Sequence, residues 1–208
     1  MNRSSLGLYL VTDSRFCAGR DLVEVVVEAV RGGVTIVQLR EKEADTRRFV
    51  GLGRRMKAAL VPYGVPLIIN DRVDVALACG ADGVHLGMSD MAVADARRLL
   101  GPDAVIGLSV ESLGQLEAWK DNGDVDYFGV SPVFSTPTKT DTAPPFGLEG
   151  LRRAAAMTSR PLVAIGGINV GNAAEVVAAG ADGLAVVSAV MGAENPRGAA
   201  ERLKGFLK

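Results

Sequence analysis

Three polar side chains that suit phosphate chemistry occupy alternate positions at the end of a short apolar run. They are Gln38, Arg40 and Lys42. If the chain stays extended, alternate side chains point to the same side. Arg offers a planar fork for phosphate oxygens and Lys a mobile point charge, so the pair predicts a polyphosphate site. The alternative is a solvent-exposed turn in which these cations pair with Glu41 or Glu43.

Two carboxylates follow the next two apolar runs. Asp71 comes directly after Leu67–Asn70, and Asp90 comes four residues after Gly83–Leu86. Mg²⁺ in proteins takes one or two carboxylates while substrate phosphates and water complete its octahedron. The alternative is that both residues are helix N-caps. The two together, near the cations above, favour a metal and diphosphate site.

A long connection follows the apolar run Tyr127–Val130. Residues 131–147 span about 17 positions, whereas loops between a strand and a helix usually run ~2–6 residues. Long loops in compact domains tend to be functional, and Thr136, Thr138 and Lys139 suit a lid that closes over an anion. The alternative is a disordered surface insertion.

These residues all follow short β-branched runs, and amphipathic helical patterns lie between the runs. The predicted strands are Leu8–Thr12, Val34–Leu39, Leu67–Asn70, Gly83–Leu86, Val105–Leu108, Tyr127–Val130, Leu162–Ile165 and Leu184–Val187. The predicted helices cover 21–33, 45–60, 91–100, 113–122, 148–157, 170–180 and 196–208. This alternation implies parallel strands with helical crossovers. We therefore predict an α/β fold, a single TIM-barrel domain, (β/α)₈, over 1–208, with a doubly wound open sheet as the alternative.

The sequence Gly-Ala-Asp-Gly occurs twice, at 80–83 and at 180–183, each time between a helical pattern and a strand. We expect each first Gly to end its helix in a left-handed conformation and each Asp side chain to accept a hydrogen bond at the turn.

In such a barrel the catalytic residues lie after the C-terminal ends of the strands. Gly166 and Gly167 follow the seventh predicted strand, and Ser188 follows the eighth. Loops at these two places commonly bind phosphate through backbone N–H groups, which glycine lets approach closely. Ser109 follows the fifth strand and either binds substrate or caps the next helix.

The composition excludes several classes of protein. The net charge is −1, 48% of the 208 residues are hydrophobic, and like charges do not cluster. The sequence therefore shows no cluster of positive charge that would bind nucleic acid or an anionic membrane. No apolar stretch reaches the ~18 residues of a membrane span, and the first ten residues do not resemble an export signal, so we expect a cytoplasmic protein.

The cysteines and the single histidine offer no obvious chemistry. Cys17 and Cys79 are far apart and lack a CxxC spacing, which indicates two incidental thiols in a reduced protein. His85 has no second His or Cys nearby for a zinc site, and we interpret it as a packed or hydrogen-bonded residue near a strand end.

Seven motifs in order resemble the thiamine phosphate synthase family. They are Tyr-Leu-Val-Thr-Asp at 9–13, Gln-Leu-Arg-Glu-Lys at 38–42, Ile-Asn-Asp-Arg-Val-Asp at 69–74, Gly-Val-His-Leu-Gly at 83–87 with Asp90, Thr-Pro-Thr-Lys at 136–139, Gly-Gly-Ile at 166–168 and Val-Val-Ser-Ala at 186–189. The resemblance covers nearly the whole chain. It implies a transferase that joins hydroxymethylpyrimidine diphosphate to a thiazole phosphate and releases pyrophosphate and thiamine phosphate.

The resemblance also implies a role for each matching residue. The pyrimidine diphosphate would contact Gln38, Leu39, Arg40, Glu41, Lys42, Asn70, Ser109 and Lys139. One Mg²⁺ per active site would bind Asp71 and Asp90, and Thr136, Pro137, Thr138, Gly167, Val187 and Ser188 would hold the thiazole phosphate. Arg40, Lys42, Ser109 and Lys139 would be catalytic. The positive charges of Arg40, Lys42 and Lys139, with Mg²⁺, would stabilise the leaving pyrophosphate.

Two positions depart from the family's pattern. Met88 stands where relatives often have Gln, and Glu111 stands where they often have His. The sister thiazole tautomerase uses such a His and lacks the paired aspartates and the loop Lys, so Glu111 favours the synthase. Two alternatives are a tautomerase-like isomerase and a non-catalytic binder of phosphate ligands. Carboxylation of the thiazole, assembly into a homo-oligomer and the order of the 131–147 loop without ligand are left open.

Overall fold

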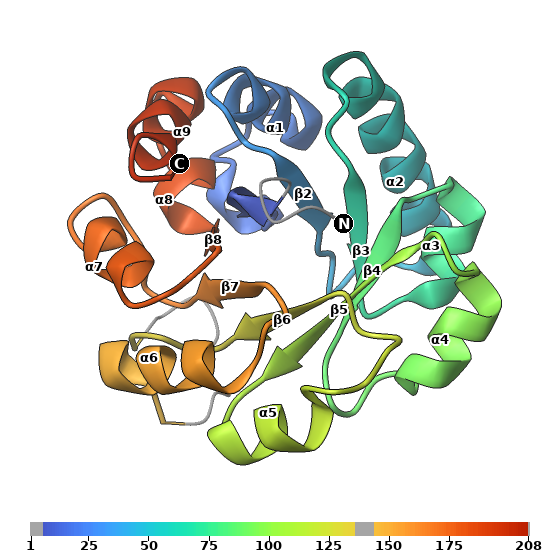
Figure 1. The fold of residues 1–208 in the computed structure, drawn as a ribbon. Helices are drawn as coiled ribbons and strands as arrows, with labels where there is room; N and C mark the ends of the chain where they lie inside the picture. Colours follow the sequence, from blue (N-terminus) through green and yellow to red (C-terminus); the bar gives the residue numbers. More distant parts are fainter. Residues whose placement is uncertain (1–5, 136–143, 208) are drawn as a thin grey trace.

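Eight parallel strands close into a barrel in the computed structural model, which describes residues 6–135 and 144–207 (Figure 1). The strands pair in sequence order, and the last pairs with the first. They are β1 (Leu8–Val11), β2 (Ile36–Leu39), β3 (Leu67–Asn70), β4 (Gly83–Leu86), β5 (Val105–Val110), β6 (Tyr127–Val130), β7 (Leu162–Ile165) and β8 (Gly183–Val186). The predicted barrel is confirmed, and the alternative open sheet is wrong.

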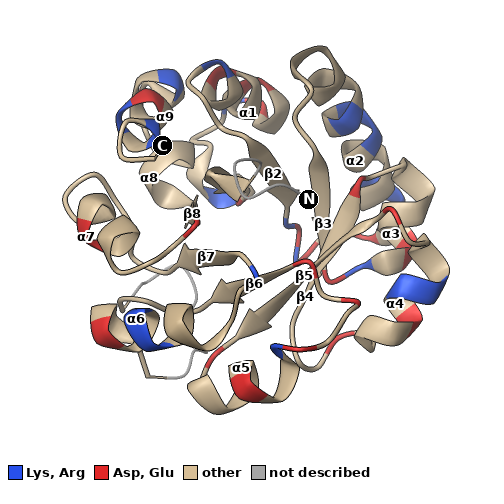
Figure 2. Cartoon of the chain, in the orientation of Figure 1, with Lys and Arg blue, Asp and Glu red and all other residues tan. Residues whose placement is uncertain are grey.

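Helices follow the strands and form an outer ring (Figure 1). They are α1 (Leu22–Arg31), α2 (Thr46–Leu60), α3 (Val73–Cys79), α4 (Val93–Leu100), α5 (Leu113–Trp119), α6 (Gly147–Met157), α7 (Ala173–Ala178), α8 (Ser188–Met191) and α9 (Pro196–Lys204), with short 3₁₀ turns at Ser14–Phe16 and Val61–Tyr63. Periodicity does not predict α8, because a single turn is too short to show a repeat. Charged residues of both signs are spread around this ring (Figure 2). Within the described residues, no helix combines the length and the apolar character that crossing a membrane requires.

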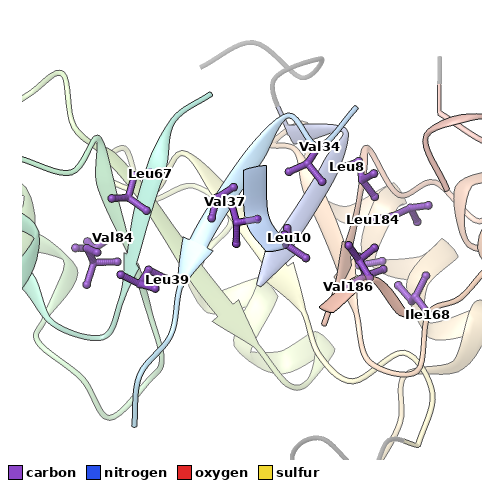
Figure 3. Packing of buried hydrophobic residues seen from close by; sticks show 14 of the residues in the cluster. Leu8, Leu10, Val34, Val37, Leu39, Leu67, Val84, Ile168, Leu184 and Val186 are labelled. Atoms are coloured by element: carbon purple, nitrogen blue, oxygen red, sulfur yellow. The ribbon is translucent and has the colours of Figure 1, made fainter. Parts of the chain in front are cut away.

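The alternation of side chains along each strand produces two apolar layers. The outer layer lies between the strands and the helices and includes Leu8, Leu10, Val37 and Leu39, which are drawn in Figure 3. The inner layer fills the barrel and contains Leu6, Tyr9, Val11, Ile36, Ile68, Tyr127, Val163 and Ala185. Because both faces of every strand are covered, the strands read as almost continuous apolar runs.

The repeated Gly-Ala-Asp-Gly turns confirm the expected glycine conformation. Gly80 and Gly180 have φ values of 69° and 102°. Each Asp reaches back to the start of the preceding strand. Asp82 Oδ2 accepts from Leu67 N at 2.7 Å, and Asp182 Oδ2 accepts from Leu162 N at 2.9 Å. These carboxylates therefore tie neighbouring strands together at the N-terminal end of the barrel.

Two glycines make room for large rings inside the barrel. Gly107 on β5 pairs with His85 on β4 and with Tyr127 on β6. A Cβ at Gly107 would overlap the Tyr127 phenol and the His85 ring, and a Cβ at Gly129 would lie 2.9 Å from Cε1 of His85. Small residues at these positions are therefore a packing requirement.

We predict that Gly107→Ala destabilises the protein by about 1–3 kcal/mol, because buried rings would have to shift. Gly51→Ala is the matched control, since Gly51 is exposed on α2 and a Cβ there meets nothing within 4 Å. We expect the control to gain about 0.5–1 kcal/mol from helix propensity. Urea unfolding measures both changes, and equal effects would contradict the packing argument.

Candidate active site

A cavity of about 920 Å³ opens at the C-terminal ends of the strands. The predicted site residues that line it are Gln38, Arg40, Lys42, Asn70, Asp71, Asp90, Ser109, Gly167, Val187 and Ser188. Thr136, Pro137, Thr138 and Lys139 lie outside the described residues. The fold thus brings together side chains that are up to 150 positions apart in the sequence.

Leu39 and Glu41 alternate with the cavity-lining residues of the same segment. The Leu39 side chain is fully buried in the outer apolar layer. Glu41 is partly buried, its Oε1 atom has no hydrogen-bond partner among the described residues, and burial raises its pKa. Neither residue lines the cavity, so their contacts with substrate stay predictions.

A hydrogen bond between the ends of β1 and β2 positions Arg40. The Arg40 backbone N–H donates to Thr12 Oγ1 at 3.0 Å, and an Arg40 guanidinium nitrogen lies 3.9 Å from Asp13 Oδ2. Asp13 is buried and accepts from Arg15 Nε at 2.9 Å and Nη2 at 2.6 Å. Hydrogen bonds from Arg15 lower the pKa of Asp13. The 9–13 motif was part of the family resemblance, but no role was predicted for Thr12 or Asp13.

The two candidate metal ligands lie beside each other at the ends of β3 and β4. The Lys42 ammonium donates to Asp71 Oδ2 at 2.7 Å. Asp90 Oδ2 accepts from the Gly87 backbone at 2.6 Å. Burial and the neighbouring Asp71 carboxyl group raise the pKa of Asp90. A carboxyl group whose ionisation is disfavoured by a neighbouring carboxyl group is a place where a cation binds well.

The N-cap alternative for these aspartates is wrong. The N-cap residues of α3 and α4 are Arg72 and Ala92, neither of which makes a side-chain capping bond. Asp71 instead has φ of +62°, a left-handed conformation that is uncommon outside glycine. Such a conformation persists only where the surroundings enforce it, and it is concentrated at functional sites.

The donor set fits Mg²⁺ better than a transition metal. Within the described residues, no group of three or more His, Cys, Asp or Glu side chains is arranged to hold a metal ion. A pair of carboxylates is sufficient for Mg²⁺, which keeps several waters and takes further oxygen ligands from substrate phosphates. Asp71 and Asp90 are therefore the residues that would hold it.

The loops after β7 and β8 form the opposite wall of the cavity. Gly166 and Gly167 have φ of 107° and 68°, and a Cβ at Gly167 would lie 2.9 Å from the Phe134 Cβ. Both positions therefore require glycine. Helix α8 begins here at Ser188, and Arg20 fixes its other end by donating to the Met191 and Ala193 carbonyls, at 2.8 Å each.

A line of hydrogen-bonded side chains crosses the barrel below the mouth. It consists of Gln38, Tyr9, Tyr127, His85 and Ser109, and we call it the interior hydrogen-bond network. The interpretation of His85 as hydrogen-bonded is confirmed, although the residue also lines the cavity. Tyr9 and Tyr127 were not among the predicted site residues.

Ser109 lies inside β5 rather than after it. Its hydroxyl lies 2.8 Å from His85 Nε2, and helix α5 is capped instead by Ser112, which accepts from the Gln115 backbone at 3.1 Å. The capping alternative for Ser109 is therefore wrong.

The fold and the motifs both have known counterparts. A family model described as thiamine monophosphate synthase matches residues 8–190. A thiamine-phosphate synthase from Albidiferax ferrireducens is 62% identical over 98% of this chain and 92% of its own length. One from Leptospira biflexa is 50% identical over 98% of this chain and 99% of its own. The solved structure of a thiamine phosphate pyrophosphorylase from Pyrococcus furiosus superimposes with a TM-score of 0.89 at 44% identity, covering 98% of this chain and 96% of that one.

We predict that His85 makes stability depend on pH in the acid range. Burial lowers its pKa from 6.5 to about 4. Between these values the unfolded chain binds a proton that the folded protein does not, so the free energy of unfolding decreases as the pH falls from 6.5 towards 4. In His85→Gln, which cannot titrate, urea unfolding at a series of pH values should show a shallower decrease over this window. Identical slopes in the two proteins would rule out this contribution.

Proposed function

The chain belongs to the thiamine monophosphate synthase family, and from this premise we propose how its cavity joins a pyrimidine diphosphate to a thiazole phosphate. The protein is a transferase of thiamine biosynthesis that forms thiamine phosphate. The identity of the two substrates, the use of one Mg²⁺ per site and a cytoplasmic location are parts of the proposal.

One observation carries the proposal. Arg40 and Lys42 line the same wall of the cavity as the Asp71 and Asp90 carboxyl groups. Two cations beside a carboxylate pair match the needs of a diphosphate with its metal ion. Because Arg40 and Lys42 already pair with Asp13 and Asp71 at 3.9 and 2.7 Å, the diphosphate would compete with these carboxylates for the cations.

Departure of pyrophosphate is the step that these residues would assist. Cleavage of the bond between the methylene carbon and the diphosphate oxygen leaves a pyrimidine-stabilised cation and pyrophosphate. Mg²⁺, when bound, supplies positive charge to the phosphate oxygens. Arg40, Lys42 and Ser109 would stabilise the negative leaving group in the cavity, and Lys139 is assigned the same role. Asn70 and Gln38 line the cavity where they would orient the pyrimidine.

The second substrate would bind on the opposite wall. Gly167, Val187 and Ser188 line it, and backbone N–H groups at such loops bind phosphate in many barrels. With its phosphate held there, the thiazole nitrogen would attack the cation. Thr136, Pro137 and Thr138 are proposed to complete this phosphate site. No proton has to be removed from carbon, which agrees with a histidine whose pKa of about 4 keeps it neutral.

We expect purified protein with both substrates and Mg²⁺ to release pyrophosphate and thiamine phosphate in equal amounts. Pyrophosphate release and product chromatography measure this. Omitting either substrate should abolish product, and a chelator should suppress it until Mg²⁺ is restored. Full turnover in chelator would contradict the metal assignment but not the transferase reaction.

We expect the double substitution Asp71→Asn, Asp90→Asn to lower kcat/KM at least ~100-fold, because it removes both charged ligands of the proposed metal. Asp95→Asn is the matched control, since Asp95 is exposed on α4 and pairs with Arg98 on the protein surface at 3.1 Å. Thermal melting should show both proteins folded. Unimpaired turnover in the double variant would refute the assignment of these ligands.

A further inference from the structure

The interior hydrogen-bond network joins Gln38 to Ser109 through the rings of Tyr9, Tyr127 and His85, and all five residues contribute to the lining of the cavity. Gln38 Nε2 donates to the Tyr9 hydroxyl at 2.9 Å, and the Tyr9 and Tyr127 hydroxyls lie 2.7 Å apart. The Tyr127 hydroxyl lies 2.9 Å from His85 Nδ1, and the Ser109 hydroxyl lies 2.8 Å from Nε2 of the same ring. Four hydrogen bonds in series therefore connect strands β2, β1, β6, β4 and β5.

The donor at one end fixes the direction of every bond in the network. The Gln38 amide is oriented with Nε2 towards Tyr9, and in this orientation the Tyr9 hydroxyl accepts from Gln38 and gives its own proton to Tyr127. Tyr127 then gives its proton to Nδ1 of His85. A neutral imidazole carries one N–H, which is therefore on Nε2 and donates to the Ser109 oxygen.

If the hydrogen bonds ran in the reverse direction, or if the His85 imidazole were protonated, one buried hydroxyl proton would have no acceptor. If Nδ1 of His85 donated to Tyr127, then Tyr127 would donate to Tyr9. The Tyr9 hydroxyl would then receive two donors and keep a proton with no acceptor. Tyr9 is 1% exposed, and a buried donor without an acceptor is rare in folded proteins. With the Gln38 amide in this orientation, the network excludes an N–H on Nδ1, which a protonated imidazole would also have.

The surrounding strands are adapted to this network. Gly107 and Gly129 leave the space that the Tyr127 and His85 rings occupy. The two tyrosine rings also pack against each other, with centroids 5.9 Å apart. With the rings held on several sides, the hydroxyl and imidazole groups have little freedom to form other bonds.

We propose that Tyr127 and His85 are positioning residues that make the Ser109 hydroxyl a hydrogen-bond donor towards the cavity. In the described part of the chain the partner of this hydroxyl is Nε2 of His85. Since Ser109 accepts from Nε2, its own proton is available to an acceptor atom of the pyrimidine diphosphate. The identity of that acceptor rests on the function proposed above, whereas the direction of the network does not.

The first test reads the tautomer of the histidine directly. His85 is the single histidine of the sequence, so a ¹⁵N–¹H correlation spectrum of the imidazole in the free protein at neutral pH contains one set of ring signals. We expect the Nε2–H tautomer. The Nδ1–H tautomer, or an equal mixture of the two, would overturn the proposal. This measurement needs neither a substrate nor a variant.

The second test asks whether Tyr127 acts through Ser109. We expect Ser109→Ala to lower kcat about tenfold, the effect of one lost hydrogen bond. Tyr127→Phe should lower kcat in the wild-type background and have no further effect when Ser109 is already Ala. Tyr63→Phe is the matched control, because Tyr63 is a surface tyrosine whose hydroxyl also accepts a hydrogen bond, from Arg31 at 3.1 Å.

The outcomes separate this inference from the proposed function. If Tyr127→Phe and Ser109→Ala multiply their effects, Tyr127 does not act through Ser109 and the positioning role is refuted. A protein with the Nε2–H tautomer and no turnover would refute the proposed function and keep the direction of the network. Normal turnover with the Nδ1–H tautomer would do the reverse.

Discussion

Closure of the barrel is the constraint on which the rest of the structure depends. Because β1 pairs with both β2 and β8, every second side chain of each strand points into one shared interior of fixed width. The His85 and Tyr127 rings fit there because the neighbouring strand contributes no side chain at Gly107. The register places Gly107 between His85 and Tyr127. The glycines Gly107 and Gly129 and the rings of Tyr9, His85 and Tyr127 therefore depend on one another for their packing.

The strands and the mouth of the barrel could be predicted from the sequence because their signals are local. Four strands cover the residues expected, namely 67–70, 83–86, 127–130 and 162–165. Short apolar runs that are flanked by Gly or Pro and rich in β-branched residues favour a strand over a helix. The alternate spacing of Gln38, Arg40 and Lys42 similarly predicted that their side chains share one side of the chain, and all three line the cavity. Strand β5 is longer than expected, which moved Ser109 from a loop into the barrel wall.

The interior network could not be predicted because its signal is not local. Tyr9 and Tyr127 are 118 positions apart, and nothing in either neighbourhood shows that their hydroxyls meet. A polar ring in a strand has the same local pattern whether it contacts a ligand, a partner ring or water. Gly107 and Gly129 were the available signs, since glycine inside a strand indicates a close approach of another group.

The cavity contains charged side chains at its mouth and neutral hydrogen-bonding groups deeper in the barrel, and solvent affects the two differently. At the mouth, Lys42 is 55% exposed and pairs with Asp71, so its attraction for an anion is screened by salt and shared with a carboxylate. Deeper in the barrel, the network is neutral, and its buried dipoles are fixed by packing rather than by counterions. Fixed dipoles need no reorganisation when charge develops nearby, which makes even a neutral donor effective in a closed site. A net charge of −1 is therefore compatible with anionic substrates, since the binding groups are local and partly uncharged.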